Sequence, residues 1–491
     1  VEFIIIDFLL KSWYNQCQPQ RNKKGSEEIA MKYILKNKDI DVLEFEAISQ
    51  SKQGEFKIDV EQNLQNIQLL NKKLLPINFS FELEKGTHLN EALMSWIRHR
   101  KAPNSRKYIE KIINTYKQEN MPEMATDYID ISLGLSLNDS FWIVPADKDY
   151  KWKDFNLYDN EFSEALKLVA FGEISKKLSG LTSSPEYTTS GMLPKCWHKD
   201  ESGIYLYKGS SQEYANGGKE AFGEYYMAQI ADIMGFNHIN YNLVEFHGKM
   251  VSACSIFTNE NEGYVPIYYL LSQEELRSKK SNKGLEAIVK IYGREKFEDL
   301  MLFDAIIYNT DRHLGNFGMM INNDTNEILR SAPIFDNGSS IFNKPTKDDL
   351  KSLNLRMKEF YSYFEYAFDE QLRLFVQPRH IPNLQKLTEF EFIKHSEFNL
   401  GDEWLESIQV YLQDRAKFAL QIAYEKQDKE EQSKKDFAGF EFSNTSGMDK
   451  IRDEALAKEQ SSINTQKPTK NDGDKPDTDK DKPSGPSGPR M

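Results

Sequence analysis

The sequence predicts an α+β fold in which a sheet-rich part of moderate size precedes a larger helical part. Residues 186–257 are rich in strand patterns and contain one helical pattern. Helical patterns dominate residues 266–424, which contain one hairpin near 317–335. Because ligands commonly bind between two such parts, we expect a two-lobed molecule with a cleft lined by the end of the first part and the loops of the second.

Length and composition narrow the class of protein. A chain of 491 residues, with 12% aromatic and 28% charged residues, predicts two or three globular domains. The net charge of −13 argues against direct binding of nucleic acid, although a local basic pocket for phosphates remains compatible with it. The three distant cysteines exclude a disulfide framework, and no apolar run is long enough to span a membrane. We expect a cytoplasmic protein and leave export into other cells open.

The remaining segments carry weaker signals. Residues 1–80 show no motif, although the apolar first ten predict a buried strand or short helix. Residues 88–118 predict two helices on either side of Pro103, and the alternating residues 128–137, with the apolar run 141–144, predict a strand or hairpin. Residues 426–460 predict a frayed helix or linker, and residues 461–491 predict disorder.

The expected divisions are an N-terminal extension (1–85), a helical and β segment that packs on the next lobe (86–185), the sheet-rich lobe (186–260), the helical lobe (261–425), and a linker with a tail (426–491).

The strongest chemical signal is a pair of polar motifs joined by the hairpin. Asp311 and Asn316 lie on one loop after an apolar helical stretch, and Asp336 follows the hairpin, so the three should converge. A hydroxyl that attacks a phosphate needs an Asp to accept its proton, and Mg²⁺ prefers carboxylate and amide oxygens as ligands. The order Asp-x-x-x-x-Asn, hairpin, Asp-x-Gly is the one protein kinases use for these roles. Helix capping and turn formation are the alternative explanation of the same residues.

The sheet-rich part offers a lysine for the phosphates. Lys208 ends a short apolar strand, and Glu224 lies on the inner face of the next helical pattern, which Gly235 should end. An ion pair between Lys208 and Glu224 is therefore expected. The preceding turn at Ser190 and Gly191 could wrap phosphates with its backbone N–H groups, although it is not rich in glycine.

In order and spacing, these motifs over residues 186–425 resemble the HipA-like serine/threonine kinases of bacteria. The resemblance implies a protein-kinase-like fold, a β-rich lobe before a helical lobe, with ATP and Mg²⁺ as cofactors. It implies Asp311 as catalytic base, Asn316 and Asp336 as metal ligands, Lys208 as the phosphate-binding lysine and His313 as a neighbour of the nucleotide. The strand 251–257 would supply the adenine-binding hinge. The full set of expected ATP-binding residues is Ser190, Gly191, Met192, Leu193, Pro194, Lys195, Lys208, Glu224, Ser255, Phe257, His313, Asn316 and Asp336.

The resemblance also implies autophosphorylation just before the phosphate loop. The matching position is Thr188, with Thr189 and Ser190 adjacent. Two departures from the family pattern stand out: Ser255 occupies a hinge position that is usually acidic, and Met192-Leu193-Pro194 replaces more polar loop residues.

Three functions fit these residues. The first is a protein serine/threonine kinase that also modifies itself. The second is a kinase-like binding module without catalysis, and the third is a kinase of a small molecule or lipid. The expected partner is a protein with a Ser or Thr acceptor, while an antitoxin-like or host-protein partner stays open.

Overall fold

The computed structural model describes residues 28–53, 58–84, 86–102, 129, 132–172, 185, 192–211 and 218–463, with the side chains of the last helix as far as Lys434. The α+β class and the order of a sheet-rich part before a helical part are confirmed. The expectations for residues 1–10 and for a second helix between Pro103 and residue 118 fall outside the described residues.

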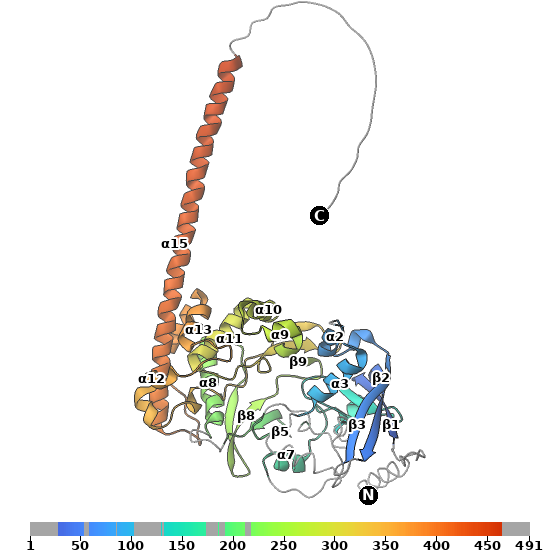
Figure 1. Ribbon diagram of the computed structural model, residues 1–491. Helices are drawn as coiled ribbons and strands as arrows, with labels where there is room; N and C mark the ends of the chain where they lie inside the picture. Colours follow the sequence, from blue (N-terminus) through green and yellow to red (C-terminus); the bar gives the residue numbers. More distant parts are fainter. Residues whose placement is uncertain are drawn as a thin grey trace, which may run out of the picture. The chain divides into compact units, whose positions relative to one another are not determined.

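An antiparallel sheet opens the described chain, where the sequence showed no motif (Figure 1). Its strand order is β3-β2-β1-β4, and its strands are β1 (Glu28–Asn37), β2 (Ile40–Gln53), β3 (Ile58–Leu69) and β4 (Phe141–Pro145). The helices η1 (Lys72–Leu74), α2 (Ile77–Glu84) and α3 (Leu89–Arg100) follow β3. Tyr33, Phe45, Trp96 and Phe141 share one core, so the segments 1–85 and 86–185 contribute to the same sheet and core.

The strand predicted over residues 128–137 is wrong for its described part. Ile129 and Ser132 are helical, and residues 133–140 form turns that lead into β4. Leu133, Leu135 and Leu137 are nevertheless all buried. Ser132 and Ser136 are buried as well, so this turn-rich loop is buried along its length, and the period of two in the sequence does not correspond to burial on one face of a strand.

A second antiparallel sheet forms the sheet-rich lobe, with the order β5-β6-β8-β7. Helix α8 lies between its second and third strands in sequence and ends at Gly235, which has a positive φ of 69° as predicted for a helix end. From the preceding segment, α7 packs on β5. The elements are α6 (Trp152–Phe155), α7 (Glu164–Ala170), β5 (Lys195–Asp200), β6 (Gly203–Lys208), α8 (Glu220–Met234), β7 (Tyr241–Phe246) and β8 (Lys249–Ser255).

The helical lobe contains the largest buried core and a three-stranded sheet of order β11-β10-β9. The predicted hairpin is present as β10 and β11. The elements are β9 (Glu262–Pro266), η3 (Ile267–Leu270), α9 (Gln273–Arg277), α10 (Asn282–Tyr292), α11 (Arg294–Ile307), β10 (Gly318–Asn322), β11 (Ile328–Ser331), η4 (Ile341–Asn343), η5 (Asp348–Ser352), α12 (Leu353–Met357), α13 (Phe368–Phe375), η6 (Pro378–His380), α14 (Ile381–Leu387) and α15 (Asp402–Ile463).

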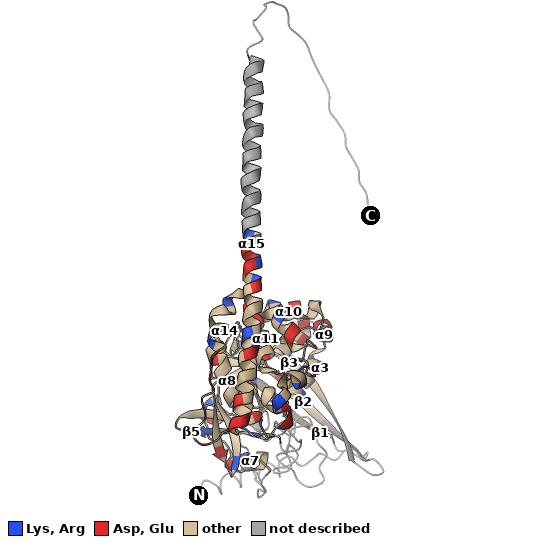
Figure 2. Cartoon of the chain, turned by 90° about the vertical axis from the view of Figure 1, so that its left-hand side faces the viewer, with Lys and Arg blue, Asp and Glu red and all other residues tan. Residues whose placement is uncertain are grey.

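Residues 427–491 form a unit separate from residues 1–426. Within it, the chain is helical to Ile463, so the segment 426–460 is a helix, and residues 464–491 lie outside the described part. Acidic and basic positions are interspersed along the coloured part of α15 (Figure 2). No helix among the described residues is both long and apolar enough to cross a membrane.

Candidate functional site

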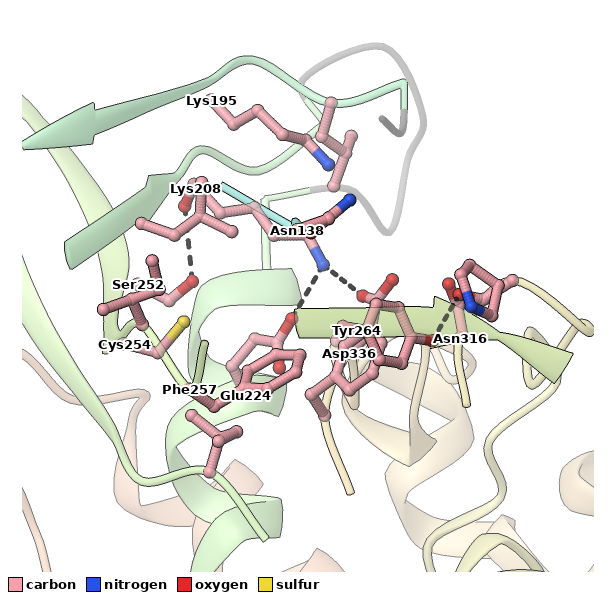
Figure 3. Close-up of a pocket in the computed structure, with 18 of the residues that line it drawn as sticks. Asn138, Lys195, Lys208, Glu224, Ser252, Cys254, Phe257, Tyr264, Asn316 and Asp336 are labelled. Atoms are coloured by element: carbon pink, nitrogen blue, oxygen red, sulfur yellow. Dashed lines mark hydrogen bonds and ion pairs between the residues drawn. The ribbon is translucent and has the colours of Figure 1, made fainter. Parts of the chain in front are cut away.

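A cavity of about 780 Å³ brings together residues of both lobes. Strand β6, helix α8, the segment after β8, the loop after α11 and the segment after β11 all line it (Figure 3). The expected site residues found on its lining are Met192, Leu193, Lys195, Lys208, Glu224, Ser255, Phe257, Asp311, His313, Asn316 and Asp336.

Lys208 makes two ion pairs, one within the sheet-rich lobe and one across to the helical lobe. Its Nζ lies 2.7 Å from Oε1 of Glu224 and also pairs with the carboxylate of Asp336 (Figure 3). The second oxygen of Glu224, Oε2, accepts a hydrogen bond of 2.9 Å from the backbone N–H of Asn337. Glu224 therefore holds both the lysine and the segment that carries Asp336.

The charges of this cluster shift its pKa values. Burial alone would lower the pKa of Lys208, but the carboxylates of Asp336 and Glu224 raise it above its usual value. Burial would raise the pKa of Asp336, but Lys208 and then Lys195 lower it well below its usual range. Both side chains are therefore charged at neutral pH. The pKa of Asp311 is raised, mainly by burial and also by Asp336, while His313 opposes that shift.

A buried arginine fixes the loop that carries Asp311 and Asn316. Arg312, only 2% exposed, donates to both carboxylate oxygens of Asp304 on α11, with Nε at 3.2 and 3.0 Å. Its other nitrogens donate to the backbone carbonyl of Phe335 and to Oδ1 of Asn337, the latter at 2.7 Å. The Asp304–Arg312 pair thus links the loop to the segment of Asp336. Sequence reasoning missed this role, because an arginine in a polar loop usually points to solvent.

The amide of Asn316 is oriented by the same loop. Its Nδ2 donates to the backbone carbonyl of Asp311 at 2.9 Å, which leaves the amide oxygen available as a ligand. Asn316 and Asp336 both line the cavity, and they offer the amide and carboxylate oxygens that suit Mg²⁺. Among the described residues, no group of three or more His, Cys, Asp or Glu could hold a metal ion.

The segment after β8 forms another side of the cavity. Strand β8 ends at Ser255, and the backbone N–H of Ile256 donates to the carbonyl of Ile204 at 2.9 Å. The strand therefore begins and ends two residues earlier than the expected 251–257. Phe257 packs against Tyr264 and Phe335, with ring centroids 5.5 and 5.4 Å away. These rings give the cavity an apolar side, suited to a planar base.

The expected phosphate loop is described only in part. Met192, Leu193 and Lys195 line the cavity, whereas Pro194 is buried and does not line it; its carbonyl accepts the N–H of Gly209 at 2.8 Å. Thr188, Thr189, Ser190 and Gly191 lie outside the described residues. His313 lines the cavity, and its Nδ1 accepts the N–H of Gly315 at 3.0 Å, which also stiffens the loop.

Sequence reasoning missed residues that come from the N-terminal part of the chain. His99 on α3 and Ser136, Leu137 and Asn138 before β4 all line the same cavity. They lie before residues 186–425, which carry the kinase-like motifs, and no candidate site residue was expected among them. The loop before β4 reaches the cavity because β4 pairs with β1 and because residues 132–140 form turns. Both features depend on tertiary structure.

One curated protein and two solved structures are similar to this chain. No family model matches the chain. The serine/threonine-protein kinase CtkA of Helicobacter pylori is 28% identical over 149 residues, which are 28% of this chain and 44% of the relative, so the match spans less than half of that protein. Among solved structures, a Helicobacter pylori proinflammatory kinase CtkA aligns with a TM-score of 0.38 and 20% identity, covering 49% of this chain and 95% of the other. HipA in a Shewanella oneidensis complex with HipB and operator DNA aligns with a TM-score of 0.42 and 10% identity, covering 81% and 99%.

The resemblance to the HipA-like serine/threonine kinases is thereby confirmed. It rests on the sequence match to CtkA together with the motif set at the cavity. Kinases combine a strand lysine paired with a helix glutamate, an Asp-x-x-x-x-Asn loop and a following Asp. This chain has the same arrangement in a two-lobed α+β fold.

Proposed function

We propose that this protein is an ATP- and Mg²⁺-dependent serine/threonine protein kinase of the HipA-like type. The observation that carries the proposal is the convergence of Lys208, Asp311, Asn316 and Asp336 on one cavity between the lobes. Similarity to CtkA supports phosphate transfer to Ser or Thr hydroxyls.

Each residue has a role that follows from its position. Lys208, held by Glu224, would neutralise negative charge on the phosphates, and Lys195 would add a second cation on the same side. Asp311 would orient the acceptor hydroxyl and take its proton; the raised pKa makes its carboxylate a better proton acceptor than an exposed one. The backbone of residues 255–257 would bind the base.

The metal would be held by Asn316 and Asp336. Held there, a Mg²⁺ ion would supply positive charge that stabilises the negative charge of the phosphates. The protein's own contribution is to fix both ligands, since Arg312 ties the loop of Asn316 to the segment of Asp336.

The test is phosphate transfer by purified protein with labelled ATP and Mg²⁺, comparing wild type with Asp311→Asn. We expect the wild type to label itself or a generic protein acceptor and Asp311→Asn to lose transfer by about a hundredfold or more, because the base is removed. ATP should still bind to the variant, since Lys208 and the hinge are intact.

The same assay separates the other functions. ATP binding by the wild type without any transfer would indicate the non-catalytic binding module. The third function would be indicated by two results together. The protein would phosphorylate neither protein acceptors nor itself, and it would consume ATP when a small-molecule or lipid acceptor is present. Equal transfer by wild type and Asp311→Asn would contradict the assignment of the base.

Autophosphorylation and partners belong to the same proposal. The modified site would be Thr188, Thr189 or Ser190, and mass spectrometry of the protein after incubation with ATP would locate it. The partner would be a protein that carries the acceptor hydroxyl. HipA in the Shewanella oneidensis complex is bound to HipB and operator DNA, and an antitoxin-like partner of this chain is a further candidate, as is a host protein.

A further inference from the structure

The cavity has a side that the kinase-like lobes do not supply. Ser136, Leu137 and Asn138, from the loop before β4, line it together with His99 of α3. This loop belongs to the N-terminal part of the chain, because β4 is an edge strand of the sheet that β1–β3 form. The N-terminal part thus helps to enclose the site.

The loop is held firmly on the N-terminal side. Arg100 of α3 donates two hydrogen bonds of 2.7 Å to the carboxylate of Asp139, in a paired geometry. The same guanidinium donates to the backbone carbonyls of Gly134 and Phe141. Paired arginine–carboxylate contacts are among the stronger polar interactions in proteins, so the loop has a defined position.

The loop is also joined to the segment that follows the hinge. The backbone carbonyl of Leu137 accepts hydrogen bonds from the hydroxyls of Thr258 and Tyr158, the latter at 3.1 Å. The carbonyl of Asn138 accepts the backbone N–H of Tyr264 at 2.7 Å. Gly263 permits this approach, because a Cβ at that position would lie only 2.6 Å from the carbonyl oxygen of Asn138. The loop therefore attaches beside the hinge, away from the direct contacts of Lys208 with Glu224 and Asp336.

The side chain of Asn138 is left free for a ligand. It is exposed and lines the cavity, and its amide has no hydrogen-bond partner among the described residues (Figure 3). Its backbone is fixed at both the carbonyl and the N–H, the latter donating to Oγ of Ser136 at 3.1 Å. An amide both donates and accepts, so it matches a ribose hydroxyl pair or the polar edge of a purine.

We propose that Asn138 binds the nucleoside half of the phosphate donor, so that the N-terminal part of the chain completes the nucleotide site. This inference rests on the proposed ATP-binding function and adds a specificity residue that lies outside the kinase-like lobes. The phosphate half of the donor is bound independently, by Lys208 and the residues around it.

The test measures the affinity of the full chain for ATP and for inorganic tripolyphosphate, which lacks the nucleoside, by calorimetry. We expect Asn138→Ala to weaken ATP binding roughly two- to tenfold, the worth of one neutral hydrogen bond, with tripolyphosphate binding unchanged. Asn261→Ala, an exposed asparagine that does not line the cavity, is the matched control and should change neither affinity.

The outcomes distinguish this inference from the proposed function. Wild-type protein that binds no ATP would overturn both. Wild-type protein that binds ATP while Asn138→Ala binds it equally well would overturn only the role of Asn138. Equal weakening of ATP and tripolyphosphate would also overturn it, because the contact would then be to the phosphates. Since the side chain of Asn138 is exposed and makes no hydrogen bond with the described residues, the melting temperature without nucleotide should be unchanged, and a fall in it would count against a ligand-binding role.

Discussion

The side chains at the base of the cavity carry an excess of negative charge. Lys208 faces two carboxylates, those of Glu224 and Asp336, so these three side chains together have one more negative charge than positive, and Lys195 adds a positive charge that acts on Asp336. Breaking a buried pair by removing one partner is strongly destabilising, because it leaves an uncompensated charge. A divalent cation that binds Asp336 would relieve the excess, and it would bring the phosphates toward Lys208 and Lys195.

A second lysine lies close to the expected base and was not recognised in the sequence. Lys344, just after η4, donates to Oγ1 of Thr310 at 2.6 Å and to Oγ of Ser339 at 3.2 Å. Burial lowers its pKa to about 8, although Asp311 and Glu220 oppose that shift. Its positive charge in turn lowers the pKa of Asp311.

We predict that Lys344→Met shifts the acid limb of the activity profile to higher pH. Asp311 accepts a proton only when ionised, and removing a nearby positive charge raises its pKa, so the variant should lose activity at a pH where the wild type still retains it. The measurement is transfer rate against pH. Lys347→Met is the control, since the side chain of Lys347 is 72% exposed and pairs with Glu403. Superimposable acid limbs for Lys344→Met and wild type would contradict the coupling.

At the scale of elements, helix α8 lies unusually close to the segment that follows Asp336. A Cβ at Gly223 would lie 2.9 Å from both the carbonyl oxygen of Gly338 and Oγ of Ser340. The next residue is Glu224, which pairs with Lys208 and binds the backbone of Asn337. A glycine at 223 thus sets the distance at which Glu224 can make both contacts.

We predict that Gly223→Ala separates α8 from residues 338–340 and lowers kinase activity. The added methyl group meets backbone atoms that cannot move freely, so overpacking should cost about 1–3 kcal/mol of unfolding free energy, partly offset by the higher helix propensity of alanine. Denaturant unfolding and transfer assays would measure both effects. Gly401→Ala is the control, because nothing lies within 4 Å of its added Cβ. Equal activity of the two variants would rule out this role of the close approach.

Elements with strong periodicity or a local chemical requirement were predictable from the sequence. The helix before Gly235, the hairpin after Asn316 and the strand that ends at Lys208 are all present. Strands β1–β3 were not predictable, because they carry many charged and polar residues on their exposed faces and only a few buried ones. The contacts of Arg312, Lys344 and Asn138 join segments far apart in the chain or on different loops, so no local pattern could indicate them.

At the scale of the whole molecule, the N-terminal sheet is docked on the hairpin of the helical lobe. Nδ2 of Asn37 donates to the backbone carbonyl of Asn323 at 2.6 Å, and Nζ of Lys38 pairs with Asp324 at 2.7 Å. Asn323 is itself buried, and its amide donates to the carbonyls of Asn259 and Glu260, in the segment between β8 and β9. The N-terminal sheet, the hairpin and this segment therefore share one hydrogen-bonded junction, next in sequence to Thr258, which lines the cavity.

We predict that Asn37→Ala loosens this junction and destabilises the chain by about 1–3 kcal/mol. Asn37 is only 2% exposed, and its Oδ1 also accepts the hydroxyl of Ser140 at 2.7 Å, so the substitution leaves buried polar groups without partners. Lys38→Ala, which removes a partly exposed ion pair at the same place, should cost under about 1 kcal/mol. Denaturant unfolding measures both, and hydrogen exchange over residues 28–84 should rise in Asn37→Ala well before global unfolding. If the two variants were equally stable and exchange rose in neither, the sheet would be held by its apolar contacts alone, and the buried hydrogen bonds at Asn37 would contribute nothing measurable to the docking.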